Sequence, residues 1–390
     1  MKICILTPAF PPESWGGLAR TAERVAQHAS ALGADVHVAA FSVVADPLVL
    51  LDENRRTTRR DGITLHRLQL GRFEYPEEYR GWGDSPHTRA IKMLYQSLEI
   101  LHTAERYDLL HAFFLYPAGY VAGLLAGRYG MRSLVTLVGN DVKRHFFQPE
   151  AVAMCRSGLE NADRVVALSR ELLDLADALT PVKSKGEVIH NAVSIPSAAW
   201  RARTARSGPF RLGSGGILKY AKGLPYLLKA AAGLRERHDI SVELVGEVRV
   251  HERDSLERMI ALTGVGEILN LRPPVAREAM PAWLDSLDAF VLPSLSEGCP
   301  NILMEAMAGG LPCVASRVGA VEDLIEDGVS GLLVPYGNAQ ALQAALDGLI
   351  TMPDQGAALG RAARERMRSF SAQREQREWQ AVYRRFMGER

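Results

Sequence analysis

The sequence predicts an α/β protein made of two similar halves, each built on a parallel β-sheet. Short runs rich in β-branched residues alternate with stretches of helical periodicity almost throughout the 390 residues, which is typical of βαβ units. One polar, Arg-rich segment, residues 194–209, interrupts this alternation near the middle. We therefore expect a first domain over residues 1–195, a second over 210–370, and a C-terminal helix over 371–390 that packs back on the first.

The first half begins with the apolar run KICILTP, which predicts a buried strand. Apolar residues at helical spacing from Leu18 to Leu32 predict the helix that follows, and Gly33 ends it. Further strands are expected at residues 35–44, 62–70, 108–115, 132–139, 163–169 and 186–193.

The second half repeats this arrangement, with strands expected at residues 210–218, 240–247, 289–294, 312–316 and 331–337. Open parallel sheets bind ligands beyond the carboxyl ends of their strands. With two such sheets facing each other, we expect the ligand site in the cleft between the halves.

Composition excludes several classes of protein. Lys plus Arg number 46 and Asp plus Glu number 45, so no large net charge favours nucleic acid as a partner. The four cysteines lack the spacing of a zinc site and the density of a disulfide scaffold, which favours a cytoplasmic location. No apolar run is long enough for a transmembrane helix or a signal peptide, although peripheral membrane contact stays open.

Two carboxylates stand out in the segment SLSEGCPNILMEAMAGGLPCVAS, residues 294–316. Asn301 is expected to cap a helix, which places Glu305 one turn inside it and Glu297 on the preceding loop. Helical side chains lean toward the N-terminus, so both carboxylates can face one ligand. Because two carboxylates would repel a phosphate, we assign them to hydroxyl groups. The alternative is a solvated Glu297 and a Glu305 that only complements the helix dipole.

Residues 294–336 resemble the hallmark segment of the family 4 retaining glycosyltransferases, with the family's Glu-x7-Glu pattern at Glu297 and Glu305. The resemblance extends to GGLARTAERVAQHASALGADVHV, to YDLLHAFFLYPAGYVAGLLA, to LVTLVGNDV and to GGILKYAKGLPYLLKAAAGL. It implies a GT-B fold of two facing Rossmann-like domains, the first for the acceptor and the second for a nucleotide-sugar donor.

The resemblance also implies a role for each donor-side residue. Glu305 would hold the ribose hydroxyls, Glu297 the hydroxyls of the transferred sugar, and Lys222 would neutralise charge on the leaving diphosphate. The backbone near Gly298, Cys299 and Asn301 would line the sugar and phosphates, and Gly16 and Gly17 would approach the diphosphate from the other domain.

On the acceptor side, His111 and Asp141 are the candidate catalytic residues. Each has a structural alternative: His111 as a satisfied group at a strand end, and Asp141 as an N-cap or turn residue.

Two positions depart from the family pattern. Ile217 stands where an Arg is usual, and Phe113 where many relatives have a His. Lys219, two residues after Ile217, is expected to compensate if the loop bends suitably. The sequence has no Asp-x-Asp motif, so we expect no metal and no cofactor besides the donor substrate. The long aromatic and charged loop at residues 72–89 is expected to shape the acceptor pocket.

The expected function is transfer of a sugar from a nucleoside diphosphate donor, UDP before GDP, to a hydroxyl acceptor with retained configuration. A glycan, a lipid-linked intermediate and a secondary metabolite are all acceptors that the sequence allows. The alternatives are a pseudo-glycosyltransferase, a phosphorolytic GT-B enzyme and a non-catalytic GT-B scaffold. A dehydrogenase is disfavoured because G-x-G-x-x-G is missing.

Overall fold

The computed structural model describes residues 1–14, 16–46, 49–71, 86–196 and 208–388. Contacts between residues divide the chain into two units: Met1–Ile189 together with Glu375–Arg390, and His190–Arg374. The second unit begins at His190, a few residues before the expected boundary at residue 195. The reason is that Asn191 bonds to Cys299 and Val193 packs in the core of the second unit. The loop predicted to shape the acceptor pocket lies, over residues 72–85, outside the described residues.

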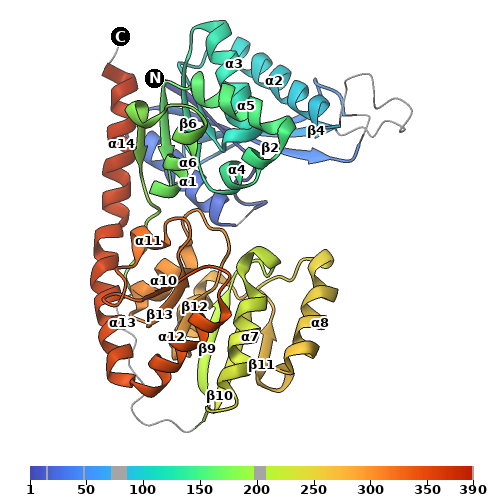
Figure 1. Cartoon of the computed structure of the whole chain (residues 1–390). Coiled ribbons are helices and arrows are strands. Elements are labelled where there is room, and N and C mark those ends of the chain that lie inside the picture. Colours follow the sequence, from blue (N-terminus) through green and yellow to red (C-terminus); the bar gives the residue numbers. More distant parts are fainter. Residues whose placement is uncertain (15, 47–48, 72–85, 197–207, 389–390) are drawn as a thin grey trace. The chain divides into compact units, whose positions relative to one another are not determined.

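The first unit alternates strands and helices (Figure 1). Its strands are β1 (Lys2–Thr7), β2 (Asp35–Val44), β3 (Arg55–Arg60), β4 (Ile63–Gly71), β5 (Leu109–Phe113), β6 (Arg132–Leu137), β7 (Arg164–Ala167) and β8 (Gly186–Val188). Its helices are α1 (Gly17–Ser30), α2 (Pro86–Glu105), α3 (Tyr120–Tyr129), α4 (Asn140–Lys143), α5 (Pro149–Glu160), α6 (Arg170–Leu179) and most of α14 (Ala372–Gly388), with short turns η2 (Leu115–Gly119), η3 (His145–Phe147) and η4 (Lys183–Lys185).

The strands of this unit form one sheet in the order β3-β4-β2-β1-β5-β6-β7-β8. Every neighbouring pair is parallel except β3 with β4. The strand order reverses between β1 and β5, so the loops after these two strands flank the switch point of the sheet, where ligands of open α/β sheets bind.

Helices α1 and α14 cover one face of this sheet. In α1 the buried residues Ala22, Val25, Ala26 and Ala29 recur at helical spacing, and they form the apolar stripe that packs on β1 and β2. Four residues of α14 join the same core: Trp379, Val382, Tyr383 and Phe386. The C-terminal helix is therefore part of the first unit's interior rather than a surface addition.

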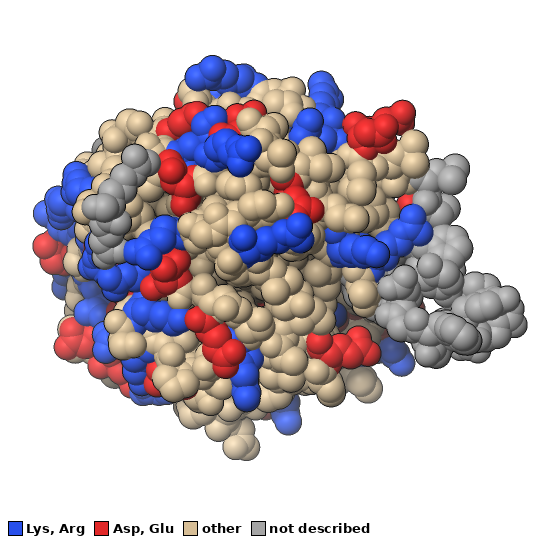
Figure 2. All heavy atoms as spheres, turned by 90° about the horizontal axis from the view of Figure 1, so that it is seen from above, with Lys and Arg blue, Asp and Glu red and all other residues tan. Residues whose placement is uncertain are grey.

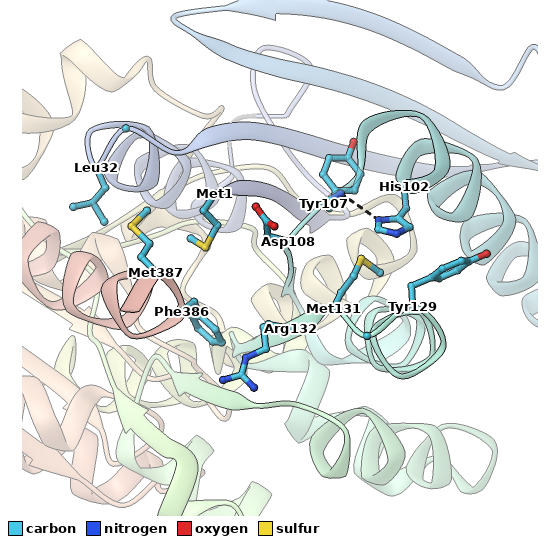
Figure 3. Close-up of a pocket in the computed structure, with 12 residues that line it drawn as sticks. Met1, Leu32, His102, Tyr107, Asp108, Tyr129, Met131, Arg132, Phe386 and Met387 are labelled. Atoms are coloured by element: carbon cyan, nitrogen blue, oxygen red, sulfur yellow. Dashed lines mark hydrogen bonds between the residues drawn. The ribbon is translucent and has the colours of Figure 1, made fainter. Parts of the chain in front are cut away.

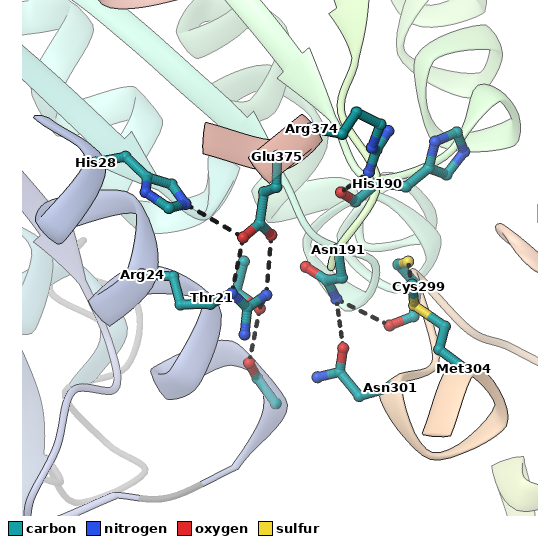
Figure 4. A network of polar contacts seen from close by, with 11 residues as sticks. Thr21, Arg24, His28, His190, Asn191, Cys299, Asn301, Met304, Arg374 and Glu375 are labelled. Atoms are coloured by element: carbon teal, nitrogen blue, oxygen red, sulfur yellow. Dashed lines mark hydrogen bonds and ion pairs between the residues drawn. The ribbon is translucent and has the colours of Figure 1, made fainter. Parts of the chain in front are cut away.

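An ion pair also ties α14 to α1. Arg24 donates from Nε and Nη2 to the two oxygens of Glu375, at 2.8 and 3.0 Å, and His28 lies 3.3 Å from one of them (Figure 4). The Glu375 side chain is only 1% exposed. Burial acts to raise its pKa, but the bonds from His28 and Arg24 outweigh burial and hold the pKa at about 2.

The second unit carries a smaller, wholly parallel sheet in the order β11-β10-β9-β12-β13-β14. Its strands are β9 (Phe210–Gly215), β10 (Ile240–Val245), β11 (Leu269–Arg272), β12 (Ala289–Leu292), β13 (Cys313–Ser316) and β14 (Leu332–Val334). Its helices are α7 (Leu224–Leu234), α8 (Arg253–Thr263), α9 (Met280–Asp285), α10 (Asn301–Gly309), α11 (Val321–Leu324), α12 (Ala339–Thr351) and α13 (Pro353–Met367), with short turns η5 (Tyr220–Lys222), η6 (Val250–Glu252), η7 (Gly266–Ile268), η8 (Arg277–Ala279) and η9 (Arg368–Phe370).

Alternate residues of each central strand in this sheet enter different cores. Phe290 and Leu292 pack with α9, α10, α11 and α13, whereas Ala289 and Val291 pack with α7, α8 and α12. A strand buried on both faces reads as a continuous apolar run. The switch point of this sheet lies between β9 and β12.

The predicted α/β fold class is confirmed, and so are the predicted strands. Two strands that the sequence did not predict are β3, with the sequence RRTTRR and every residue exposed, and β11, with three of its four residues exposed. On the face shown in Figure 2, basic and acidic side chains are interspersed rather than gathered in one large patch.

Candidate active site

A charged pair lies at the carboxyl edge of the second sheet, at its switch point. Lys222 follows β9 and Glu297 follows β12, the two strands that flank the reversal of strand order. Lys222 Nζ is 2.6 Å from Glu297 Oε1, and the two side chains are 20% and 9% exposed. Ser294 Oγ donates to the same oxygen at 2.7 Å. Among the described residues no hydrogen bond reaches Oε2 of Glu297, so this oxygen can accept a ligand hydroxyl.

Backbone contacts hold the two loops together. Leu295 N donates to Ala221 O at 2.9 Å. Gly223 adopts a positive φ of 69°, and a Cβ at this position would lie 1.8 Å from Pro293 O. Only glycine permits this approach without strain. Lys222 and Glu297 are therefore positioned by the backbone as well as by their mutual attraction.

The helix after Glu297 begins differently from the prediction. Asn301 is the first residue of α10, and Pro300 occupies the cap position with no side-chain hydrogen bond. The Asn301 side chain instead accepts a bond from Asn191 Nδ2 at 2.9 Å, and Asn191 also donates to Cys299 O at 3.1 Å (Figure 4). The prediction of Asn301 as an N-cap is wrong, because this bond to Asn191 fixes its side chain elsewhere.

Glu305 lies one turn into α10 and is half-buried among the apolar residues Met304 and Ala306. Side chains of a helix lean toward its N-terminus, and so Glu305 leans toward the loop that carries Glu297. Gly298, on that loop, is held by its carbonyl oxygen, which accepts a bond from Ala320 N at 2.8 Å.

Lys219 is half-buried in the loop after β9, two residues after the exposed Ile217. Burial lowers the pKa of Lys219, and the positive charges of Lys222 and Arg249 lower it further. The positive charges of Lys219, Lys222 and Arg249 therefore lie close enough to interact.

In the first unit, Gly16 and Gly17 lie at the start of α1, after the first strand of that unit's switch point. Both are exposed. Gly16 has an ordinary φ of −65°, and no atom would lie within 4 Å of a Cβ added there. Neither backbone conformation nor internal packing requires glycine at this position, which leaves room for a ligand.

His111 is placed in the interior of the first unit. It is fully buried, its Nδ1 lies 2.8 Å from Tyr383 Oη, and its Nε2 lies 2.7 Å from Thr136 Oγ1. Burial lowers the pKa of His111 to about 3, so the ring is neutral at neutral pH. Neighbouring Phe113 is also fully buried in this core. The structural alternative for His111 holds, and the geometry gives no support to a catalytic role.

Asp141 is likewise fully buried and engaged with the backbone. One carboxylate oxygen accepts bonds from the N–H groups of Val138 and Gly139, at 3.1 and 2.6 Å, and the other from Leu115 and Val138, at 3.0 and 3.1 Å. Burial raises the pKa of Asp141 despite these bonds. Asp141 lies in the first turn of α4, where its carboxylate binds the backbone N–H groups of neighbouring segments. Its predicted catalytic role is not supported, because both oxygens already accept hydrogen bonds.

A cavity of about 630 Å³ lies at the opposite, amino edge of the first sheet (Figure 3). Its walls include Met1, Leu32, Asp108, Arg132 and Phe386, which precede or begin strands or lie in the last turn of α14. It is therefore distinct from the carboxyl-edge site.

The described part of the chain holds neither a metal-binding cluster nor a membrane-spanning helix. No cluster of His, Cys, Asp or Glu in it could hold a metal ion. No helix in it is both long and apolar enough to cross a bilayer.

Comparison with known proteins places this geometry in a family. Residues 16–192 match the glycosyl transferase 4-like domain and residues 210–352 match the glycosyl transferases of group 1. The D-inositol 3-phosphate glycosyltransferase of Arthrobacter sp. strain FB24 is 30% identical over 293 residues, which cover 69% of this chain and 68% of that protein.

Solved structures show the same fold. Sucrose-phosphate synthase from Thermosynechococcus elongatus has a TM-score of 0.80 at 20% identity and covers all of both chains. Anabaena HepE, solved in complex with UDP-glucose, has a TM-score of 0.74 at 19% identity and covers 98% of this chain and 99% of its own.

The fold and these matches define a glycosyltransferase of the GT-B class. The chain belongs to the family 4 glycosyltransferases.

Proposed function

We propose that the chain transfers a sugar from a nucleoside diphosphate sugar, UDP before GDP, to a hydroxyl acceptor with retention of configuration. The observation that carries this proposal is the Lys222–Glu297 pair at the switch point of the second sheet. An ammonium beside a carboxylate suits a donor in which a diphosphate is joined to a polyol. The HepE structure with UDP-glucose supports UDP as the first choice.

In this proposal each charged group takes one part of the donor. Lys222 meets the diphosphate and stabilises the charge that develops as it leaves. Glu297 accepts hydroxyls of the transferred sugar through Oε2, while Ser294 holds its Oε1. Glu305 takes the ribose hydroxyls, and the backbone near Gly298 and Cys299 lines the sugar.

The proposed reaction uses no protein base at the acceptor oxygen. His111 and Asp141, the two titratable groups expected there, are buried and bonded within the first unit. The acceptor's hydroxyl proton then passes to an oxygen of the leaving diphosphate on the same face of the sugar, as the new glycosidic bond forms. The acceptor is a glycan, a lipid-linked intermediate or a secondary metabolite.

We further propose that the reaction depends on neither a metal nor a cofactor, since Lys222 supplies positive charge where the diphosphate leaves. We also propose a cytoplasmic location, which keeps thiols reduced and suits the four free cysteines.

The test is a thermal-shift panel with UDP, GDP, ADP, TDP and their common sugar conjugates. A ligand at a hundred times its Kd stabilises the folded state by about 2.7 kcal/mol, a visible rise in Tm. We expect one nucleotide series to stabilise the wild type and the control Glu267→Ala, an exposed carboxylate of the second unit, but not Glu305→Ala. A wild type that no member of the panel stabilises would contradict the proposed function.

A further inference from the structure

The pairing between β9 and β10 continues beyond the ends of both strands. The two strands pair in parallel from Phe210 with Ile240 to Gly215 with Val245. After them, Leu218 pairs with Val248 in the same register, and Leu218 N donates to Glu247 O at 2.8 Å. The next residues along these two segments are Lys219 and Arg249.

Both of these residues keep an extended backbone, with φ and ψ of −143° and 165° at Lys219 and of −61° and 138° at Arg249. Neighbouring parallel strands lie about 4.8 Å apart, and paired residues point to the same face. The register therefore sets the Lys219 and Arg249 side chains beside each other at the carboxyl edge of the sheet.

Close backbone packing holds this arrangement. Gly216 N donates to Val245 O at 3.0 Å. Gly246 has a φ of 154°, and a Cβ there would lie 1.7 Å from Gly216 O. The loop that carries Arg249 is thus pressed against the loop that carries Lys219 and Lys222.

The resulting cluster has more positive than negative charge. The ammonium of Lys219 is repelled by the positive charges of Lys222 and Arg249. It is attracted by the negative charges of Glu297 and Glu252. Arg249 is exposed, and its guanidinium has no hydrogen bond or ion pair within the described residues. Three cations held together repel one another, and a multiply charged anion would relieve that repulsion.

We propose that Arg249, with Lys219 beside it, binds the diphosphate of the donor and positions it for Lys222. This inference rests on the proposed function and adds a positioning residue to it. A guanidinium matches two phosphate oxygens at once, which an ammonium cannot do. Arg249 therefore sets the orientation of the diphosphate, whereas Lys222 stabilises the charge at the bond that breaks.

The test compares three probes by titration calorimetry on the full chain: UDP, GDP and inorganic pyrophosphate, with uridine and guanosine as uncharged partners. We expect Arg249→Ala to raise the Kd of the diphosphates about tenfold, the size of one charge-assisted hydrogen bond, and to leave nucleoside binding unchanged. The salt dependence of diphosphate binding should become shallower in the same variant.

Three further variants sharpen this test. Arg258→Ala removes another exposed arginine of the same segment, on α8, and should bind like the wild type. Arg249→Lys should fall between the wild type and Arg249→Ala. Ile217→Arg, added to Arg249→Ala, returns a guanidinium to an exposed position of the adjacent loop and should recover part of the affinity.

The outcomes separate this inference from the proposed function. If the wild type binds UDP or GDP and Arg249→Ala binds them within twofold, the role of Arg249 is overturned and the proposed function stands. Equal losses for diphosphates and nucleosides would also overturn it, because they would show a structural effect. If the wild type binds no nucleoside diphosphate, with ADP and TDP also titrated, both proposals fail.

Discussion

The carboxyl edges of the two sheets carry polar residues of similar types, yet the residues differ in what they can do. In the second unit, Lys222 and Glu297 are partly exposed, and one carboxylate oxygen of Glu297 has no hydrogen bond within the described residues. In the first unit, His111 and Asp141 are fully buried and bonded at every nitrogen or oxygen. A titratable residue at a strand end can therefore act on a ligand only where it keeps both exposure and an unused polar atom.

The largest effect that this comparison predicts is on turnover, at Lys222. We expect Lys222→Ala to lower the rate of sugar transfer about 10²- to 10³-fold, as when one stabilising group is removed from a developing negative charge. The rate is expressed per folded molecule, because the variant leaves the largely buried Glu297 without its cation. The measurement is release of the nucleoside diphosphate from the donor under saturating conditions.

The matched control is Lys229→Ala, an exposed lysine on α7, which should keep wild-type turnover. If the turnover of Lys222→Ala stayed within fivefold of the wild-type value, the proposed difference between the two sheets would be wrong. Lys222 would then have only a structural role, like His111.

The next effect is on stability, at Asp141. In the wild type, backbone N–H groups donate to both carboxylate oxygens of Asp141. In Asp141→Asn, an amide N–H₂ replaces one of these oxygens and cannot accept those bonds. We expect the free energy of unfolding to fall by about 3 kcal/mol, the range for a buried group left unsatisfied beside a lost charge-assisted bond. Turnover per folded molecule should stay near the wild-type value.

Urea unfolding and initial rates below the transition measure these two quantities separately. The neighbouring Asn140→Ala, at an exposed position, serves as control. Loss of turnover with unchanged stability would reverse the assignment of Asp141 and make it a catalytic residue.

The smallest effect concerns a second ion pair, Arg24 with Glu375. Unlike Lys222–Glu297, which joins two loops, this pair joins two helices, α1 and α14. We expect Glu375→Gln to lower the free energy of unfolding by about 2 kcal/mol at pH 7 without changing turnover. The exposed pair Glu365–Arg368 supplies the control, because Glu365→Gln should have almost no effect.

The pH dependence of this difference follows from the lowered pKa of Glu375. The unfolded carboxyl titrates near 4.5 and the folded one at about 2, so the stabilisation is fully present above pH 4.5 and is lost as pH falls toward 2. The gap in unfolding free energy between wild type and Glu375→Gln should therefore narrow below pH 4.5. A gap that widens on acidification would show that Glu375 is stabilised in its protonated form.

Much of this architecture could be predicted from the sequence, because the central strands are continuous apolar runs. The expected strand at 35–44 coincides with β2, and the predicted first strand with β1. The edge strand β3 was missed because its residues, RRTTRR, are all exposed and lack the apolar alternation that marks a strand in a sequence.

The candidate site was predicted unevenly, for a physical reason. Glu297 and Lys222 each follow a central strand of the second sheet. Each also lies in a local sequence motif, which is why the sequence alone could indicate them. The burial of His111 depends on Tyr383, which lies 272 residues away in sequence, and the position of Asn301 depends on Asn191. No local pattern contains such partners. Ser294 was missed as a partner of Glu297, although its place three residues earlier could have suggested it.

The C-terminal helix has a consequence for the order in which the protein folds. The first unit's core includes Trp379 and Tyr383, both fully buried, and these residues follow every residue of the second unit. Proteins fold domain by domain as they leave the ribosome, usually with the earlier domain first. Here the later domain can complete its core first, while the earlier one waits until α14 has been synthesised.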